Sequence, residues 1–104
     1  MAKISAQGVQ SMTRKEYNGW TNYETWVTKL WLDNDEGSYR YWADQARHAD
    51  IATLAKQLES EHDEAIPENM TTGLFADLLT SALQEVNWEE IAESLIEENQ
   101  EDAA

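Results

Sequence analysis

The chain has 104 residues, enough for one domain, and its 41% apolar content can supply a hydrophobic core. It contains no cysteine, which excludes disulfide bonds, thiolate metal sites and a cysteine nucleophile. No apolar run reaches the roughly 20 residues that span a bilayer, and the first residues lack the apolar core of a secretory signal. We therefore expect a cytoplasmic protein with no membrane contact.

The net charge of −14 is distributed unevenly along the chain. Residues 1–56 hold seven lysines and arginines and seven acids, whereas residues 57–104 hold fourteen acids and neither lysine nor arginine. Carboxylates repel phosphates, so the second half disfavours direct nucleic-acid binding and would attract a basic partner protein or a cation.

The first predicted elements are an arm, a turn and a helix. Residues 1–16 are polar and mixed in charge, which predicts a flexible arm, and Asn18-Gly19 is typical of a turn. Thr21 and Glu24 have the spacing of a capping box, which predicts a helix over residues 22–33. Its apolar side has helical spacing and is predicted to be core: Tyr23, Trp26, Val27, Leu30 and Trp31.

Four further segments have helical periodicity. Asp35 or Ser38 can cap a second helix, and Asp50 can cap a third, unless the third merely continues the second. The fourth is expected to start at Thr71 or Thr72, and the fifth to follow the cap pattern of Asn87. The residues predicted to face inward are, in order, Tyr39, Trp42, Ala43 and Ala46; Ile51, Leu54, Ala55 and Leu58; Leu74, Phe75, Leu78, Leu79, Ala82 and Leu83; Trp88, Ile91, Ala92, Leu95 and Ile96.

No stretch alternates with a period of two over a useful length, although residues 39–42 are aromatic enough for a short strand as the alternative. The predicted fold is a single small all-α domain of four to five helices over residues 17–98. A frayed acidic tail is expected over residues 99–104.

The fifth predicted helix has an acidic outer side. Its outward positions include Glu89, Glu90, Glu93, Glu97, Glu98 and Glu101. Steps of four residues rise about 6 Å along a helix, which is comparable to the spacing of phosphates along one DNA strand. Such a row can occupy the DNA-binding groove of another protein. The alternative is a solvated face that serves only solubility.

Eight of the ten aromatic residues fall within residues 17–42. Most lie on helical stripes and are predicted to be core. Trp20 lies in the turn before the first helix, and Tyr41 lies off the side that carries Tyr39 and Trp42. We expect these two rings, Trp20 and Tyr41, to be exposed and available to a partner, because Trp and Tyr dominate binding hot spots.

No catalytic, cofactor or metal site is predicted. Residues 33–37 resemble the start of a calcium loop, but the glycine falls at position five instead of six, and an acidic turn with a helix cap is the preferred interpretation. His48 and His62 fit no zinc spacing and are expected to be solvated. Phosphate-binding, dinucleotide and nucleophile-elbow motifs are absent from the sequence, so an enzyme is not expected.

Two segments carry a resemblance. The first is Asn18-Gly19-Trp20-x-Asn22-Tyr23-Glu24-Thr25-Trp26 with Leu30-Trp31-Leu32-Asp33-Asn34-Asp35-Glu36-Gly37. The second combines residues 75–79 with residues 86–92. Both are similar to a family of small proteins of uncharacterised function from phages, plasmids and their bacterial hosts. The resemblance implies a phage or plasmid setting in a bacterial host cytoplasm, and no catalytic residues. In size and acidity the chain also resembles DNA-mimic anti-restriction proteins.

We therefore expect a non-enzymatic protein that binds and inhibits a host nucleic-acid-handling or defence protein through a basic groove. The alternative is an accessory protein that forms a homodimer through its aromatic block, with acidity serving solubility. An enzyme or metal-binding domain is third.

Overall fold

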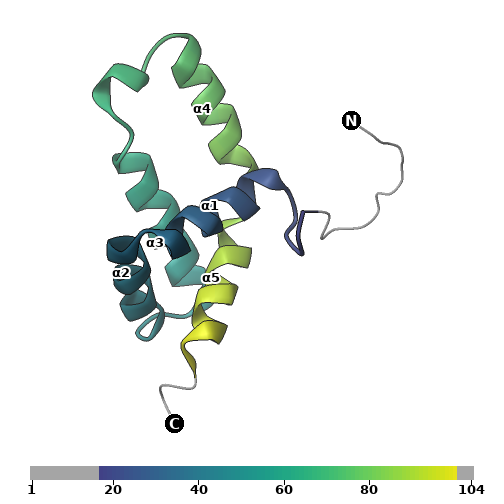
Figure 1. Ribbon diagram of the computed structural model, residues 1–104. Helices are drawn as coiled ribbons and strands as arrows, with labels where there is room; N and C mark the ends of the chain where they lie inside the picture. Colours follow the sequence, from purple (N-terminus) through teal and green to yellow (C-terminus); the bar gives the residue numbers. More distant parts are fainter. Residues whose placement is uncertain (1–16, 101–104) are drawn as a thin grey trace.

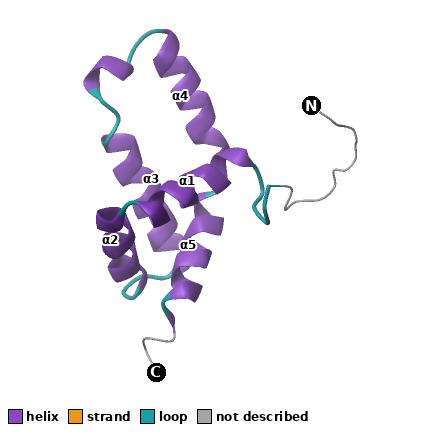
Figure 2. Cartoon of the chain, in the orientation of Figure 1, coloured by secondary structure: helices purple, strands orange, loops and turns teal. Residues whose placement is uncertain are grey.

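A computed structural model describes residues 17–100. Its elements are α1 (Tyr23–Asn34), α2 (Glu36–Ala46), α3 (Ile51–Glu64), the 3₁₀ turn η2 (Glu68–Met70), α4 (Leu74–Glu85) and α5 (Trp88–Glu98) (Figure 1). The predicted all-α fold is confirmed over these residues (Figure 2). The strand alternative for residues 39–42 is wrong, because they lie within α2. The arm predicted for residues 1–16 and residues 101–104 of the predicted tail lie outside the described part of the chain.

Short polar side chains start four of the helices. Asn22, Asp35, Asp50 and Asn87 precede α1, α2, α3 and α5, and each accepts a hydrogen bond from the backbone N–H three residues later. These bonds satisfy donors that have no partner inside the first helical turn. The caps predicted at Asp35, Asp50 and Asn87 are confirmed.

Two predicted helix starts are wrong. Thr21 does not cap α1; the cap is Asn22, one position later, and the Thr21 N–H donates instead to the Glu90 carboxylate at 3.1 Å. The fourth helix does not begin at Thr71 or Thr72. Gly73, with φ of 96°, precedes α4 and contributes no side-chain cap. A positive φ favours glycine, so the chain turns at Gly73 before the helix can begin.

The core lies where α2, α3 and α5 pack together, with Leu32 of α1 added. Its buried side chains are Leu32, Trp42, Ala46, Leu54, Ala55, Leu58, Val86, Ile91, Ala92 and Leu95. Trp88 and Ile96 are half-buried against it. The predicted inner sides of the second, third and fifth helices are therefore confirmed, except that Tyr39 and Ile51 are exposed.

The predicted inner side of α1 is wrong in part, because only Trp26 and Val27 of its five residues are half-buried. The structure buries Thr25, Lys29 and Leu32, whereas Trp31 is 70% exposed and Tyr23 and Leu30 are also exposed. The cause is a set of polar contacts at the start of α1 that apolar periodicity does not register. The Asn22 amide donates to the Glu85 carbonyl at 2.7 Å. The Asn87 N–H donates to the Thr25 hydroxyl at 2.8 Å, which turns this side of α1 toward the α4–α5 junction.

The predicted inner side of α4 is also wrong in part. Leu74, Phe75 and Leu78 are 67%, 66% and 58% exposed, and Ala76 is the buried residue of the helix. Among the helices, α4 packs chiefly against α1. Figure 1 shows α4 extending away from α1 to the η2 turn, which links it to α3. The first turns of α4 are therefore covered on the side of Ala76 and uncovered on the side of Leu74, Phe75 and Leu78.

We expect Asn22→Ala to lower the free energy of unfolding by about 1–3 kcal/mol, because it removes both a helix cap and the hydrogen bond to Glu85. Urea unfolding followed by circular dichroism measures this change. Asn34→Ala, at the exposed end of the same helix, is the matched control and should change stability by less than about 0.5 kcal/mol. Equal losses in the two variants would contradict the role assigned to Asn22.

Candidate functional site

The outer side of α5 carries a row of glutamates. Ile91, Ala92 and Leu95 point into the core, so Glu89, Glu93 and Glu97 are left exposed on the opposite side. Four helical residues rise about 6 Å, which sets the spacing of this row. We call these three residues the acidic row. Glu101, which the sequence places next in the row, lies outside the described residues.

Two other predicted site residues turn toward the protein. Glu90 is buried, with 9% of its surface exposed, and accepts the hydrogen bond from Thr21. Glu98 contacts the Lys29 ammonium at 2.9 Å and accepts a hydrogen bond from the Ser94 hydroxyl at 3.1 Å. The prediction that Glu90 lies on the outer side is wrong. The Glu98 carboxylate binds Lys29 of the same chain. Glu90 is met by Thr21 in the turn before α1, and Glu98 is met by Lys29 of α1.

Lys29 is a buried cation, with 3% of its surface exposed. Its ammonium lies 2.8 Å from Asp33 and 2.9 Å from Glu98, and 6.0 Å from the centre of the Trp20 ring. Burial lowers the pKa of the Lys29 ammonium. The hydrogen bonds and charges of Asp33 and Glu98 outweigh this effect, so the pKa lies above its ordinary value of 10.5. The ion pair with Glu98 joins α1 to the last turn of α5, whereas that with Asp33 lies within α1.

Trp20 is less accessible than the sequence predicts. Backbone hydrogen bonds of 2.9 and 2.7 Å join Tyr17 and Trp20 across the Asn18-Gly19 turn, which confirms the predicted turn. This turn folds the Trp20 ring back, half-buried, against the core and beside Lys29. The expectation that Trp20 is an exposed ring is therefore wrong.

Tyr41 is exposed, as predicted. Its hydroxyl donates to the Glu61 carboxylate of α3 at 2.9 Å, and its ring meets Trp42 edge-on at 4.9 Å between centres. The hydrogen bond to Glu61 raises the pKa of the Tyr41 phenol above its ordinary value of 10.0. Tyr41 thus presents one edge of its ring to solvent while its hydroxyl joins α2 to α3.

The two histidines differ. His48 is exposed, as expected. His62 is instead half-buried and stacked between Trp42 and Trp88, at 5.9 and 5.4 Å between ring centres, and its Nδ1 donates to the Leu58 carbonyl at 2.7 Å. The prediction of a solvated His62 is wrong, because the packing of α2, α3 and α5 brings these three rings together. The sequence offers no spacing that would reveal this stack.

The acidic turn between α1 and α2 has a structural role. The Asp35 carboxylate accepts the Ser38 N–H at 2.9 Å, and this hydrogen bond lowers the pKa of Asp35 below its ordinary value. Gly37 already lies within α2. The interpretation of residues 33–37 as a turn with a helix cap is confirmed. Within residues 17–100, no three His, Asp or Glu side chains gather as a metal site would require.

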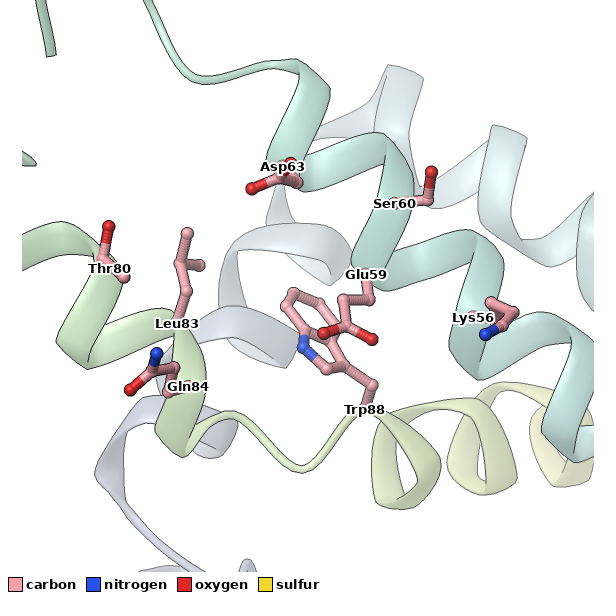
Figure 3. Close-up of a pocket in the computed structure, with 8 residues that line it drawn as sticks. All are labelled: Lys56, Glu59, Ser60, Asp63, Thr80, Leu83, Gln84 and Trp88. Atoms are coloured by element: carbon pink, nitrogen blue, oxygen red, sulfur yellow. The ribbon is translucent and has the colours of Figure 1, made fainter. Parts of the chain in front are cut away.

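A groove of about 640 Å³ lies between α3 and α4 (Figure 3). Its lining residues are Lys56, Glu59, Ser60, Asp63, Thr80, Leu83, Gln84 and Trp88. Figure 3 shows Trp88 lying between the two helices, with Glu59 of α3 close to its ring. Sequence reasoning missed this groove, because it depends on how far α3 and α4 diverge.

The fold defines a small all-α protein with a row of exposed glutamates on its last helix. The chain belongs to DUF7249, a family of unknown function, which matches residues 13–102. The predicted relationship to a family of uncharacterised function is thereby confirmed. No curated protein and no solved structure matches the chain. Over the described residues, no helix combines the length and the apolar character needed to cross a membrane.

We expect Lys29→Met to lower the free energy of unfolding at neutral pH by about 1–3 kcal/mol, the range for hydrogen bonds to charged groups. Asp33 and Glu98 are partly exposed, so water can solvate them once the ammonium is gone. Urea unfolding measures the loss. Lys56→Met, on the exposed side of α3, should change stability by no more than about 0.5 kcal/mol.

A pH dependence follows from the raised pKa of Lys29. The folded chain holds this proton more tightly than the unfolded chain, so the stabilisation is fully present below the ordinary value of 10.5. It disappears as the pH rises through the folded-state pKa. We therefore expect the stability difference between the wild type and Lys29→Met to shrink as the pH rises above the ordinary value of 10.5. A difference that stays constant as the pH rises would refute the ion-pair account.

Proposed function

We propose that this protein is a non-enzymatic inhibitor that binds a nucleic-acid-handling or defence protein in the cytoplasm of a bacterial host. In this proposal the acidic row occupies a basic groove where DNA or RNA otherwise lies. The resemblance to phage and plasmid proteins supplies the biological setting. The single observation that carries the proposal is the exposure of Glu89, Glu93 and Glu97 on one side of α5.

The surrounding charge supports this proposal. Among the described residues of the second half, no lysine or arginine accompanies the acids. Lys29 is buried between two carboxylates, and Arg40 and Arg47 pair with acids of their own helix. Among the described basic residues, the exposed Lys56 lines a pocket together with Glu89 and can offset part of the charge at the start of the acidic row. The remaining negative field around α5 would draw a basic partner and raise its association rate.

The local energetics support it as well. Each pair of glutamates four residues apart costs a few tenths of a kcal/mol in a helix. The acidic row contains two such pairs, and no cation is interleaved. A basic groove would relieve this repulsion on binding. The competing explanation for the acidic row is that water solvates it and that it serves only solubility.

A second candidate function is an accessory protein that self-associates through its aromatic block. The observation that favours it is the exposure of Trp31, at 70%, together with that of Tyr39 and Tyr41. Exposed aromatic rings of this kind are enriched at binding hot spots.

A capture experiment from bacterial lysate separates these candidates. The tagged protein is used as bait, bound proteins are eluted in salt steps, and the experiment is repeated with competing duplex DNA. Mimicry predicts capture of a nucleic-acid-binding protein that both salt and DNA release. Capture that DNA does not compete would argue against mimicry.

For the captured partner, we expect the triple variant Glu89→Gln, Glu93→Gln, Glu97→Gln to weaken binding about tenfold or more and to flatten its salt dependence. The matched control is Glu59→Gln, Glu64→Gln, Glu68→Gln, which removes the same charge from exposed positions elsewhere. Binding measured by calorimetry at several salt concentrations compares the two. Equal weakening by both variants would show that net charge, and not the acidic row, drives binding.

A further inference from the structure

The apolar side of α4 is covered at one end only. At 100° per residue, six apolar residues fall within half of the helix circumference: Leu74, Phe75, Leu78, Leu79, Ala82 and Leu83. The last three are half-buried, whereas Leu74, Phe75 and Leu78 are 67%, 66% and 58% exposed. We call these three exposed residues the α4 patch.

The position of α1 explains this difference. The hydrogen bond from Asn22 to the Glu85 carbonyl fixes the start of α1 at the last turn of α4. The first turns of α4 extend past it. On another side of α4, Thr80 and Gln84 line the groove toward α3, so the α4 patch does not face α3 (Figure 3). The described chain therefore leaves the patch without a packing partner.

A helix of this kind needs tertiary packing. α4 has 12 residues, and isolated helices shorter than about 12–15 residues are marginal in water. Monomeric proteins rarely expose a contiguous group of large apolar side chains without a binding role. A partner that packs on the α4 patch would stabilise the helix. This partner must be present wherever the protein itself is present.

Charge identifies the kind of partner. Residues 69–84 contain a single ionisable side chain, Asp77, in a half of the chain that otherwise holds thirteen acids. A basic partner would find almost no carboxylates here to pair with. Two copies of this acidic chain would repel one another across most of their surface. The α4 region is the longest stretch of the described chain where they could meet with little repulsion.

The α4 patch supplies about half of the area that a stable dimer needs. If a side chain of this size offers about 150–250 Å², the α4 patch supplies roughly 300–450 Å² per copy. A stable interface buries about 800 Å² per partner. Met70, which is 40% exposed beside the start of α4, and the polar residues that flank the patch can contribute to the remainder.

We infer that the protein forms a homodimer in which the α4 patch packs against the same patch of a second copy. A two-fold axis across the patch makes the two helices antiparallel and makes the interface self-complementary. This interface is separate from the acidic row on α5, and it does not depend on the proposed inhibitory function. In the dimer each copy keeps its acidic row.

Sedimentation equilibrium of the full chain at several concentrations tests this inference. We expect a concentration-dependent dimer, and we expect the double variant Phe75→Glu, Leu78→Glu to raise its dissociation constant by about 100-fold or more. The matched control is Thr80→Glu, Gln84→Glu, which adds the same charge to the groove side of the same helix and should leave the dimer unchanged. Circular dichroism checks that each variant remains helical.

A second measurement does not depend on introducing charge. The chain has no cysteine, so Leu78→Cys creates a single thiol near the proposed two-fold axis. Mild oxidation should link two copies of this variant, whereas Ser60→Cys on α3 should stay unlinked. A wild-type chain that is monomeric at every concentration would overturn the inference, as would a dimer that survives the Phe75→Glu, Leu78→Glu substitutions.

The outcomes also separate this inference from the proposed function. The Phe75→Glu, Leu78→Glu variant should weaken dimerisation and leave salt-sensitive binding to a basic partner in place. Conversely, the glutamine variants of the acidic row should weaken that binding and leave the dimer intact.

Discussion

The polar contact between the start of α1 and the α4–α5 junction sets the arrangement of the rest of the molecule. Asn22 caps α1 and also donates to Glu85, and Thr25 accepts the Asn87 N–H. Thr25 is fully buried, and a buried hydroxyl is costly to leave unpaired, so its bond to Asn87 helps to fix the rotation of α1. That rotation buries Lys29 and leaves Trp31 exposed.

The same rotation divides the acids into two groups. Glu90 and Glu98 sit where α5 meets the first helix and its preceding turn, and each binds a donor there. Glu89, Glu93 and Glu97 project to solvent on the other side of α5. Within α5, the acids of the first group make contacts that hold the fold together, whereas those of the second face solvent and are available to a basic partner. Net charge alone does not distinguish the two groups.

The molecule thus presents two surfaces of opposite character. The acidic row attracts cations and is weakened by salt. The α4 patch carries almost no charge, and an interface made by it is stabilised because apolar side chains are buried away from water. Because α4 is held at one end by α1 and linked to α3 only through η2, its exposed half is free to pack on a second copy without disturbing the acidic row. The proposed inhibition and the inferred dimerisation can therefore be tested separately.

The sequence by itself determined the local features of this protein. Asp35, Asp50 and Asn87 revealed the starts of three helices, because a cap is satisfied by the N–H three residues later. The buried stripes of α3 and α5 followed from periodicity, since neighbouring helices cover both along most of their length.

Only the tertiary structure decided the faces of α1 and α4, the burial of Glu90 and the stacking of His62. The deciding contacts of α1 join residues 62 to 69 positions apart, such as Thr25 with Asn87 and Lys29 with Glu98. The periodicity of α4 correctly marked an apolar side, but it carried no information on how far α1 would reach along that side. A helix pattern states what a segment can bury, whereas the rest of the fold determines what it does bury.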